Sequence, residues 1–325
     1  MNCTLPRRGM ALVMVLLLLV VMASVCINLS LLISQQTDRM RSLQDYQQAT
    51  WYAVSAESLA LSILNENLKN EEYVHPLESW SSGLHLFPLP QGQIAVTLRD
   101  AQACFNLNAL ARPTKVPRPL VGQQLVALIS RLDVSVQQAE LIAESLQTFT
   151  GGNRDVPTHM GRQNSEYLTR PVPFWPANQP LTDISEIRVV HGMDIGLYQK
   201  LKSLVCALPV NSQQININTL DVSQSVILEA LFAPWLSPVQ ARSLLQQRPG
   251  KGWNNVGQFL ASPYLKKVDE NIKKQVGELL TVNSNYFWLR SDIAVNDIEL
   301  TMNSLITRMD PQYFSVIWHQ TGEIE

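Results

Sequence analysis

Residues that commonly carry out catalysis are few and widely separated in this sequence. The five histidines form no H-E-x-x-H pair and have no cysteine close by in the chain: His75, His85, His159, His191 and His319. The sequence also lacks the phosphate-binding G-x-x-x-x-G-K-S/T motif, the dinucleotide-binding G-x-G-x-x-G motif and the G-x-S-x-G motif of serine hydrolases. Zinc proteases, nucleotide-dependent enzymes and hydrolases of these classes depend on such patterns. We therefore predict that the chain is not an enzyme.

A long apolar segment near the N-terminus is the most informative feature of the sequence. Residues Met10 to Ile33 are mostly Leu, Val, Met and Ile and include no charged residue. A helix of this length can cross a hydrocarbon core of about 30 Å. Arg7 and Arg8 precede the segment, so the positive-inside rule predicts that the C-terminal mass lies across the membrane. A secretory signal cut near Ala23 is the alternative, but it would not require the apolar run to continue.

The segment after the membrane span is predicted to continue as the same helix. No Gly or Pro occurs between Met10 and His75, which allows one helix to run to about Lys69. Apolar residues recur there at steps of three and four, which predicts one apolar stripe. The stripe consists of Met40, Leu43, Tyr46, Ala49, Ala53, Ala56, Ala60 and Ile63.

Strand patterns stand on both sides of a long helical region. Residues 94–98 alternate large apolar with smaller or polar side chains after a Gln91-Gly92 turn signal. Segments 286–295, 298–308 and 314–320 are rich in aromatic and β-branched residues. We predict an α+β fold in which a long N-terminal helix packs on a small antiparallel sheet, with a large all-α insert between the strands of that sheet.

The insert contains a weak internal repeat. Residues 105–110, Phe-Asn-Leu-Asn-Ala-Leu, match residues 215–220, Ile-Asn-Ile-Asn-Thr-Leu. Each motif precedes a helix and then a serine that can cap the next helix, Ser135 or Ser237. We therefore predict two related helical halves with a seam near residues 171–214.

The second half, residues 215–258, also resembles a helix-hairpin-helix module that grips DNA phosphates. Such modules approach phosphate through a Gly-rich turn, whereas residues 232–236 contain no Gly and include Pro234, which lacks an N–H donor. The net charge of −2 also gives no chain-wide basic field. We predict a helical scaffold that does not bind nucleic acid. The alternative is a membrane-anchored helix-hairpin-helix DNA-binding protein of a competence-like system.

The residues just before the membrane span resemble a prepilin leader. Pro6-Arg7-Arg8-Gly9, followed by Met10 and the apolar run, is similar to the cleavage site of type IV pilins and type II secretion pseudopilins. The resemblance implies that residues 1–9 form a leader with basic residues Arg7 and Arg8. It implies that a prepilin peptidase cuts between Gly9 and Met10 and methylates the new N-terminus at Met10. A third alternative is an anchored adaptor that is never processed and never joins a filament.

The fifth residue after the cut departs from the usual pseudopilin pattern. Most family members have Glu there, where it compensates the N-terminal ammonium of a neighbouring subunit, but this chain has Met14. Because an unpaired charge in lipid is costly, the absence of this Glu suits a subunit on which no other subunit docks. The large minor pseudopilins, the K subunits, resemble this pattern. Further similarity to them lies in residues 98–108, 183–188, 207–209, 215–219 and 284–287.

The resemblance to K subunits implies a complete domain plan and a role. Residues 10–33 would be the transmembrane part of the pilin helix, 34–104 the periplasmic helix and first strands, 105–282 the helical insert, and 283–325 the last strands. The chain would be a structural minor pseudopilin at the tip of the type II secretion pseudopilus and would aid export of folded proteins across the outer membrane. Its partners would be minor pseudopilins I and J, the major pseudopilin and the prepilin peptidase. It would cross the inner membrane once, with a cytoplasmic N-terminus and a periplasmic bulk.

Two cysteines and two acidic residues remain as candidate site residues. Cys104 and Cys206 would both be periplasmic, where disulfides form, so we expect a structural bridge between them; two buried free thiols are the alternative. Calcium is the cofactor implied by the family, but only Asp155 and Glu166 remain in the segments that supply its acidic ligands. Because calcium needs six to eight oxygen ligands, we expect no metal and no other cofactor.

Overall fold

The computed structural model describes residues 10–69, 73–81, 83–112, 119–151, 167–310 and 313–322. Residues 1–9, with the expected leader residues Arg7, Arg8 and Gly9, lie outside this part of the chain. Asp155 and Glu166, the acidic remnants of the expected calcium segments, also lie outside it. The mature N-terminus that we predict, Met10, is the first described residue.

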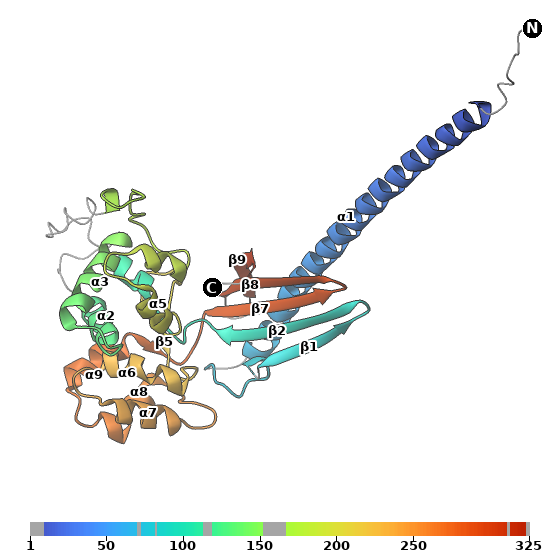
Figure 1. Ribbon diagram of the computed structural model, residues 1–325. Helices are drawn as coiled ribbons and strands as arrows, with labels where there is room; N and C mark the ends of the chain where they lie inside the picture. Colours follow the sequence, from blue (N-terminus) through green and yellow to red (C-terminus); the bar gives the residue numbers. More distant parts are fainter. Residues whose placement is uncertain are drawn as a thin grey trace, which may run out of the picture.

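One helix, α1 (Met10–Leu68), contains the apolar segment and its continuation. It projects from the body of the protein as a long rod that points away from the insert (Figure 1). Residues 10–33 of α1 are exposed all round in this structure, and the helix is long and apolar enough to cross a membrane. No Gly or Pro interrupts it, which explains why it stays continuous through the apolar segment and beyond.

The body is built on a five-stranded antiparallel sheet of order β1-β2-β7-β8-β9. Its strands are β1 (Leu84–Leu89), β2 (Gly92–Asp100), β7 (Tyr286–Val295), β8 (Ile298–Asp310) and β9 (Tyr313–Thr321). The predicted α+β class and antiparallel sheet are therefore confirmed. Strand β1 was not predicted: it contains Pro88, which cannot donate a ladder hydrogen bond and is tolerated because β1 lies at the edge of the sheet.

The C-terminal half of α1 packs on one face of this sheet. Four alanines spaced by three or four residues are buried there, Ala49, Ala53, Ala56 and Ala60, and their small side chains let the helix lie close to the strands. Across from them lie buried side chains of β2, β7 and β8 that alternate along each strand, including Ile94, Val96, Leu98, Phe287, Leu289, Met302 and Ile306.

The predicted apolar stripe of α1 is only partly a packing surface for the sheet. Ala49, Ala53, Ala56 and Ala60 are buried and Ile63 is half-buried, as a sheet-packing stripe requires. Met40, Leu43 and Tyr46 are exposed instead. Because a straight helix has 3.6 residues per turn, a run of steps of three rotates away from the sheet, so this end of the stripe is left uncovered.

The insert between β2 and β7 has two halves that follow the same plan. The first contains β3 (Phe105–Asn106), η2 (Leu107–Ala111), α2 (Leu120–Ser130), α3 (Val136–Phe149), η3 (Ile184–Val189), α5 (Ile195–Leu201) and β4 (Val205–Cys206). The second contains β5 (Ile215–Asn216), η4 (Val222–Gln224), α6 (Ser225–Leu231), α7 (Pro238–Gln246), α8 (Val256–Leu260), η5 (Pro263–Leu265), α9 (Glu270–Gly277) and β6 (Leu280–Thr281). A single 3-10 turn, η1 (Ser79–Ser81), precedes the sheet.

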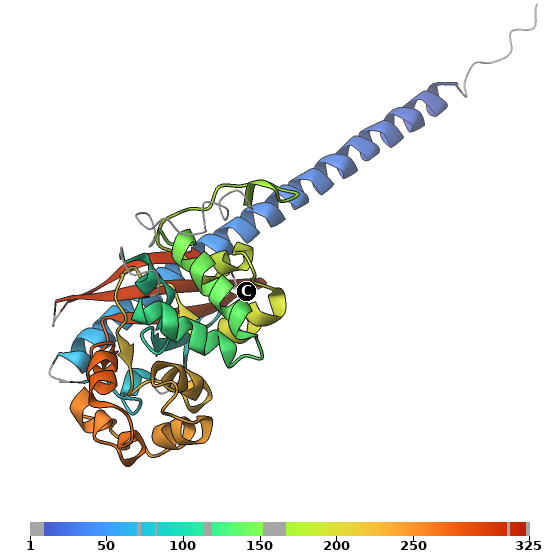
Figure 2. The same ribbon diagram turned by 90° about the vertical axis from the view of Figure 1, so that its left-hand side faces the viewer.

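Each half begins and ends with a two-residue strand, and the two strands pair in parallel. Phe105 pairs with Val205 in the first half, and Ile215 pairs with Leu280 in the second. Both halves share one hydrophobic core that runs through the insert. Figures 1 and 2 show the helices gathered at one end of the sheet. These parallel pairs were not predicted, because two residues are too few to show a strand period.

Candidate functional site

The surface of α1 that faces away from the sheet carries no charge over a long distance. Between Arg41 and Glu66, every exposed residue is uncharged: Ser42, Leu43, Gln44, Tyr46, Gln47, Trp51, Ser55, Ser58, Leu59 and Ser62. We call this set the uncharged face of α1. A helix that faced water permanently would carry charged residues on this side. The Trp51 side chain is 72% exposed. A large aromatic side chain on an uncharged helix surface marks a contact site for another molecule.

Hydroxyl groups on this side of α1 are already hydrogen-bonded to their own helix. Ser55 Oγ donates to the Trp51 carbonyl at 2.8 Å, Ser58 Oγ to the Val54 carbonyl at 3.2 Å and Ser42 Oγ to the Asp38 carbonyl at 3.1 Å. A satisfied hydroxyl can be covered without leaving a polar group unpaired. Small, satisfied side chains are the kind that allow another helix to approach closely.

The two acidic residues in this part of α1 point toward the sheet. Glu57 is buried and accepts hydrogen bonds from Ser304 Oγ at 2.6 Å, and His319 Nδ1 lies 3.0 Å from the same oxygen. Asp45 accepts from Asn296 Nδ2 at 2.9 Å. These contacts tie α1 to the β7-β8 turn and to strands β8 and β9. They also leave the opposite side of the helix uncharged.

A carboxylate lies at the junction of the sheet and the insert. Asp100, the last residue of β2, accepts hydrogen bonds on Oδ2 from Asn216 Nδ2 at 2.8 Å, Thr219 Oγ1 at 2.5 Å and Ser284 Oγ at 2.5 Å. Its Oδ1 accepts from the Gln102 backbone at 2.7 Å. These donors come from the start of the insert, the start of its second half and the return to β7. Asp100 therefore joins three segments that are far apart in the sequence.

Gln102 reinforces the same junction. Its side chain donates to the Gln214 carbonyl at 2.8 Å and accepts from the Asn285 backbone at 2.5 Å. Its own carbonyl accepts from the Asn216 backbone at 3.0 Å. Residues 100–102, 214–219 and 284–285 are thus held together by side-chain and backbone bonds, which fixes how the insert sits on the sheet.

Burial shifts the acid–base behaviour of Asp100. The residue is half-buried by its accessible surface, but its carboxyl group is enclosed by the four donors. Removal from solvent, the largest effect, raises the pKa of Asp100 above 3.8, while the hydrogen bonds from Ser284, Thr219, Gln102 and Asn216 act in the opposite direction. Among the described residues, the hydrogen-bond partners of the Asp100 carboxyl group are amide and hydroxyl groups and include no second acid or histidine. This arrangement indicates a structural role for Asp100.

The two cysteines that were expected to form a bridge, Cys104 and Cys206, form a disulfide in the structure. Cys104 and Cys206 are bonded, with a distance of 5.9 Å between their Cα atoms. Cys104 directly precedes β3, and Cys206 is the second residue of β4, where it pairs with Asn106. With Ala101, Leu208 and Leu305 they form a small buried cluster on the face of the sheet opposite α1. The bridge therefore fastens both ends of the first half at the junction with the sheet.

Paired asparagines explain the internal repeat. Asn108 accepts from the Leu181 backbone at 2.7 Å and donates to the Leu181 carbonyl at 2.8 Å. Asn218 makes the same two bonds with Trp253, at 2.7 Å and 3.0 Å. An extra Cβ at Gly252 would lie only 2.5 Å from Asn218 Cγ, so glycine is required beside this clamp. The repeated Asn-x-Asn motif is structural.

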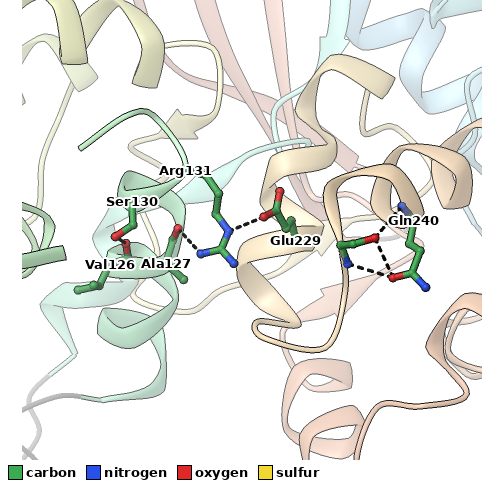
Figure 3. A network of polar contacts seen from close by, with 7 residues as sticks. Val126, Ala127, Ser130, Arg131, Glu229 and Gln240 are labelled. Atoms are coloured by element: carbon green, nitrogen blue, oxygen red, sulfur yellow. Dashed lines mark hydrogen bonds and ion pairs between the residues drawn. The ribbon is translucent and has the colours of Figure 1, made fainter. Parts of the chain in front are cut away.

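An ion pair joins the two halves of the insert (Figure 3). Arg131, which follows α2, donates from Nε to Glu229 of α6 at 2.6 Å and from Nη1 to the Ala127 carbonyl at 3.2 Å. The Glu229 side chain is only 10% exposed. Figure 3 also shows Gln240, whose side chain closes the capping box with Ser237 at the start of α7. The predicted caps of Ser135 and Ser237 are both present.

Other candidate residues are not brought together. Met10 and Met14 are exposed near the free end of α1, and Cys26 is a free, exposed cysteine within the apolar segment. Within the described residues, no three His, Cys, Asp or Glu side chains gather as a metal site would require. The turn that was compared with a DNA-binding hairpin places Phe232 and Leu236 in the core. The uncharged face of α1 and the Asp100 junction were not found from the sequence, although the segment between Arg41 and Glu66 contains only two charged residues, Asp45 and Glu57, which was a usable signal.

Comparisons with known proteins match almost the whole chain. Two family models of type II secretion system protein K match residues 103–210 and 215–283, which correspond to the two halves of the insert. Type II secretion system protein K of Klebsiella pneumoniae is 34% identical over 325 residues, covering 97% of both chains. That of Pectobacterium carotovorum subsp. carotovorum is 32% identical over 322 residues, also covering 97% of both.

A solved structure is similar over most of the chain. The crystal structure of the GspK-GspI-GspJ complex from the type 2 secretion system of enterotoxigenic Escherichia coli contains a chain that is 69% identical, with a TM-score of 0.82. The match covers 88% of this chain and 100% of that chain. The alternative of a DNA-binding protein of a competence-like system finds no support among these relatives.

Proposed function

This chain belongs to the type II secretion system protein K family and is a minor pseudopilin of type II secretion, and from this we propose that it is a structural tip subunit without catalytic activity or cofactor. We propose that its partners are minor pseudopilins I and J, together with the major pseudopilin. In the similar solved structure, the related chain is in a complex with GspI and GspJ. The uncharged face of α1 is the observation in this chain that supports such partners.

The uncharged face of α1 suits permanent contact with other helices. It lies on the same helix as the apolar segment, separated from it by residues 34–41, which include the exposed Asp38, Arg39 and Arg41. Interfaces that stay assembled are depleted of charge and enriched in aromatic residues. The face carries Trp51 and Tyr46 among small satisfied side chains. We propose that pseudopilin helices pack against it.

A charged residue in this face is expected to prevent assembly. Trp51→Arg places an uncompensated cation where another helix would cover it, and we expect at least about a tenfold loss of the complex with minor pseudopilins I and J. Co-purification of the detergent-solubilised full chain with both partners measures this. The matched control is Trp175→Arg, which replaces a tryptophan of similar exposure, 70% against 72%, in the insert. Equal complex formation by both variants would show that the face is not the contact.

Membrane insertion and processing form the second part of the proposal. We propose that the chain crosses the inner membrane once, with its N-terminus in the cytoplasm and its bulk in the periplasm, and that a prepilin peptidase cuts between Gly9 and Met10. Arg7 and Arg8 before the apolar segment support the orientation. Met14 at the fifth mature position supports a place at the tip, where no other subunit docks on it.

Processing is expected to depend on the peptidase. Intact mass and N-terminal sequencing of the chain, produced with and without a prepilin peptidase, should show a start at N-methylated Met10 only when the peptidase is present. Gly9→Leu should leave the start at Met1, because a bulky side chain replaces the glycine before the cut. A chain that starts at Met1 both with and without the peptidase, or a chain that starts at Ser24, would contradict pilin-type processing.

A further inference from the structure

A groove lies on the face of the sheet opposite α1, where the first half of the insert meets the strands. Its volume is about 550 Å³. Strands β2, β7 and β8 form its floor through Thr97, Arg99, Trp288, Arg290 and Asn303, and the insert forms its wall through Thr182 and Lys202. The alternation of side chains along the strands places these residues on the side away from α1. The uncharged face of α1 and this groove therefore open on opposite sides of the sheet.

A second hollow of about 600 Å³ continues the groove. Both hollows are lined by Thr182 and Ala207, so they adjoin at these residues. Trp288 lines the first hollow and Trp318 the second, and their rings meet edge to face with centroids 5.2 Å apart. The two hollows together form an elongated surface lined by two tryptophans, which suits an extended peptide. A compact small molecule would fill only one of the hollows.

The acidic and basic side chains of the groove differ in whether they are already paired within the protein. Its acidic residues are engaged: Asp292 accepts from Arg290 at 2.9 Å and from Thr301, and Asp183 caps η3 by accepting from the Ser185 backbone at 2.8 Å. Hydrogen bonds from Arg290 and Thr301 lower the pKa of Asp292, although its partial burial, the largest effect, opposes them. The ion pairs found in the described part of the chain include neither Arg99 nor Lys202, and both residues are exposed.

The walls of the groove are held in place before anything binds. Cys206 lines the groove and is bonded to Cys104, and the adjoining Ala207 and Leu208 belong to a segment packed on Leu305, Trp288 and Trp318. Asp100 at the floor is fixed by its four hydrogen-bond donors. A site that is ordered in advance loses less free energy when a flexible segment binds.

We propose that this groove binds an extended segment of an exported protein, one that carries carboxylate side chains next to an aromatic or aliphatic side chain. The carboxylates pair with Arg99 and Lys202, and the apolar side chain lies against Trp288 and Trp318. The proposal rests on the role of the chain as a subunit of the secretion pseudopilus.

Charge distinguishes this occupant from another pseudopilin. Contacts that form once and persist are depleted of charge, as on α1, whereas exposed, unpaired cations in a groove favour rapid, reversible encounters with an acidic partner. An exported protein must bind and leave at each transport event. A filament subunit need not, so the charged groove suits the exported protein and the uncharged face of α1 suits the filament.

The test is site-specific photo-crosslinking in cells that have a type II secretion system and carry the variant under test in place of their own copy of this chain. The full-length chain carries p-benzoyl-phenylalanine at Thr97, in the groove, or at Trp51, on α1. Adducts are identified by mass spectrometry. We expect the Thr97 probe to capture proteins whose appearance outside the cell depends on this chain, and the Trp51 probe to capture pseudopilins. The double variant Arg99→Gln/Lys202→Gln should lower the Thr97 adduct about fivefold or more and slow secretion.

Matched variants make each outcome decisive. Lys266→Gln/Lys267→Gln removes two exposed cations from the second half of the insert and should leave the adduct and secretion unchanged. No Thr97 adduct, an adduct with a pseudopilin, or an adduct unaffected by the Arg99/Lys202 variant would each overturn the groove proposal. If secretion still requires the chain and the Trp51 adduct persists, only the groove proposal fails. If secretion does not require the chain, the proposed function itself fails.

Discussion

Replacing Asp100 with Ala is expected to lower the free energy of unfolding of the folded head by about 3 kcal/mol. The change removes the shared acceptor of Asn216, Thr219 and Ser284 at a partly buried junction, and Asn216 and Thr219 keep only their weaker or shared bonds to Ser284 Oγ and the Asn216 carbonyl. Because the donors come from separate segments, the loss should loosen the insert from the sheet. Denaturant unfolding of the detergent-solubilised chain, followed by tryptophan fluorescence, measures the effect.

The control is Asp297→Ala, which removes an exposed carboxylate in the β7-β8 turn. We expect that variant to change the free energy of unfolding by less than about 0.5 kcal/mol. Similar stability of the two variants would show that Asp100 does not join the segments as described.

The same residue makes a prediction about pH. Since burial raises the pKa of Asp100 in the folded state above the unfolded value of 3.8, the folded protein holds this proton more tightly than the unfolded chain does. Its contribution to stability is then complete below the unfolded pKa and is lost as the pH rises through the folded pKa. The stability advantage of the wild type over Asp100→Asn should therefore fall as the pH rises from about 3.5 toward neutral. An advantage that grows over this range would mean that the hydrogen bonds outweigh burial.

Removing the disulfide is expected to have a larger effect than any other change considered for this chain. Cys104 and Cys206 are 102 residues apart, so the double variant Cys104→Ala/Cys206→Ala should lose about 4–5 kcal/mol in the chain-entropy model. The first half of the insert should become the least stable part, because the bridge closes its two ends against the sheet. Denaturant unfolding and limited proteolysis of the full chain measure both effects.

Cys26→Ser is the matched control, because this cysteine is free and exposed within the apolar segment. Its unfolding free energy should equal that of the wild type, with or without a thiol reductant. The wild type, but not the double variant, should be destabilised by reductant. A double variant as stable as the wild type would contradict a structural role for the bridge.

Much of the architecture could be predicted because it depends on neighbouring residues. The run from Met10 to Ile33, the lack of Gly and Pro up to His75, the alternation in strand β2 and the aromatic and β-branched composition of strands β7, β8 and β9 are local patterns. Strand β1 escaped prediction because Pro88 is tolerated only at an edge, and edges are a property of the whole sheet. The exposure of Met40, Leu43 and Tyr46 depends likewise on which side of α1 the sheet covers.

The sequence by itself determined the long apolar N-terminal helix, the α+β class, the position of the insert and the repeated Asn-x-Asn motif. Only the tertiary structure decided where Asp100 finds its partners, because Asn216, Thr219 and Ser284 lie 116, 119 and 184 residues away. The same holds for the groove, whose floor comes from strands on both sides of the insert and whose wall comes from the insert itself. Helical and strand periods arise from interactions over a few residues, whereas a site made by folding depends on packing between distant segments, which no local pattern records.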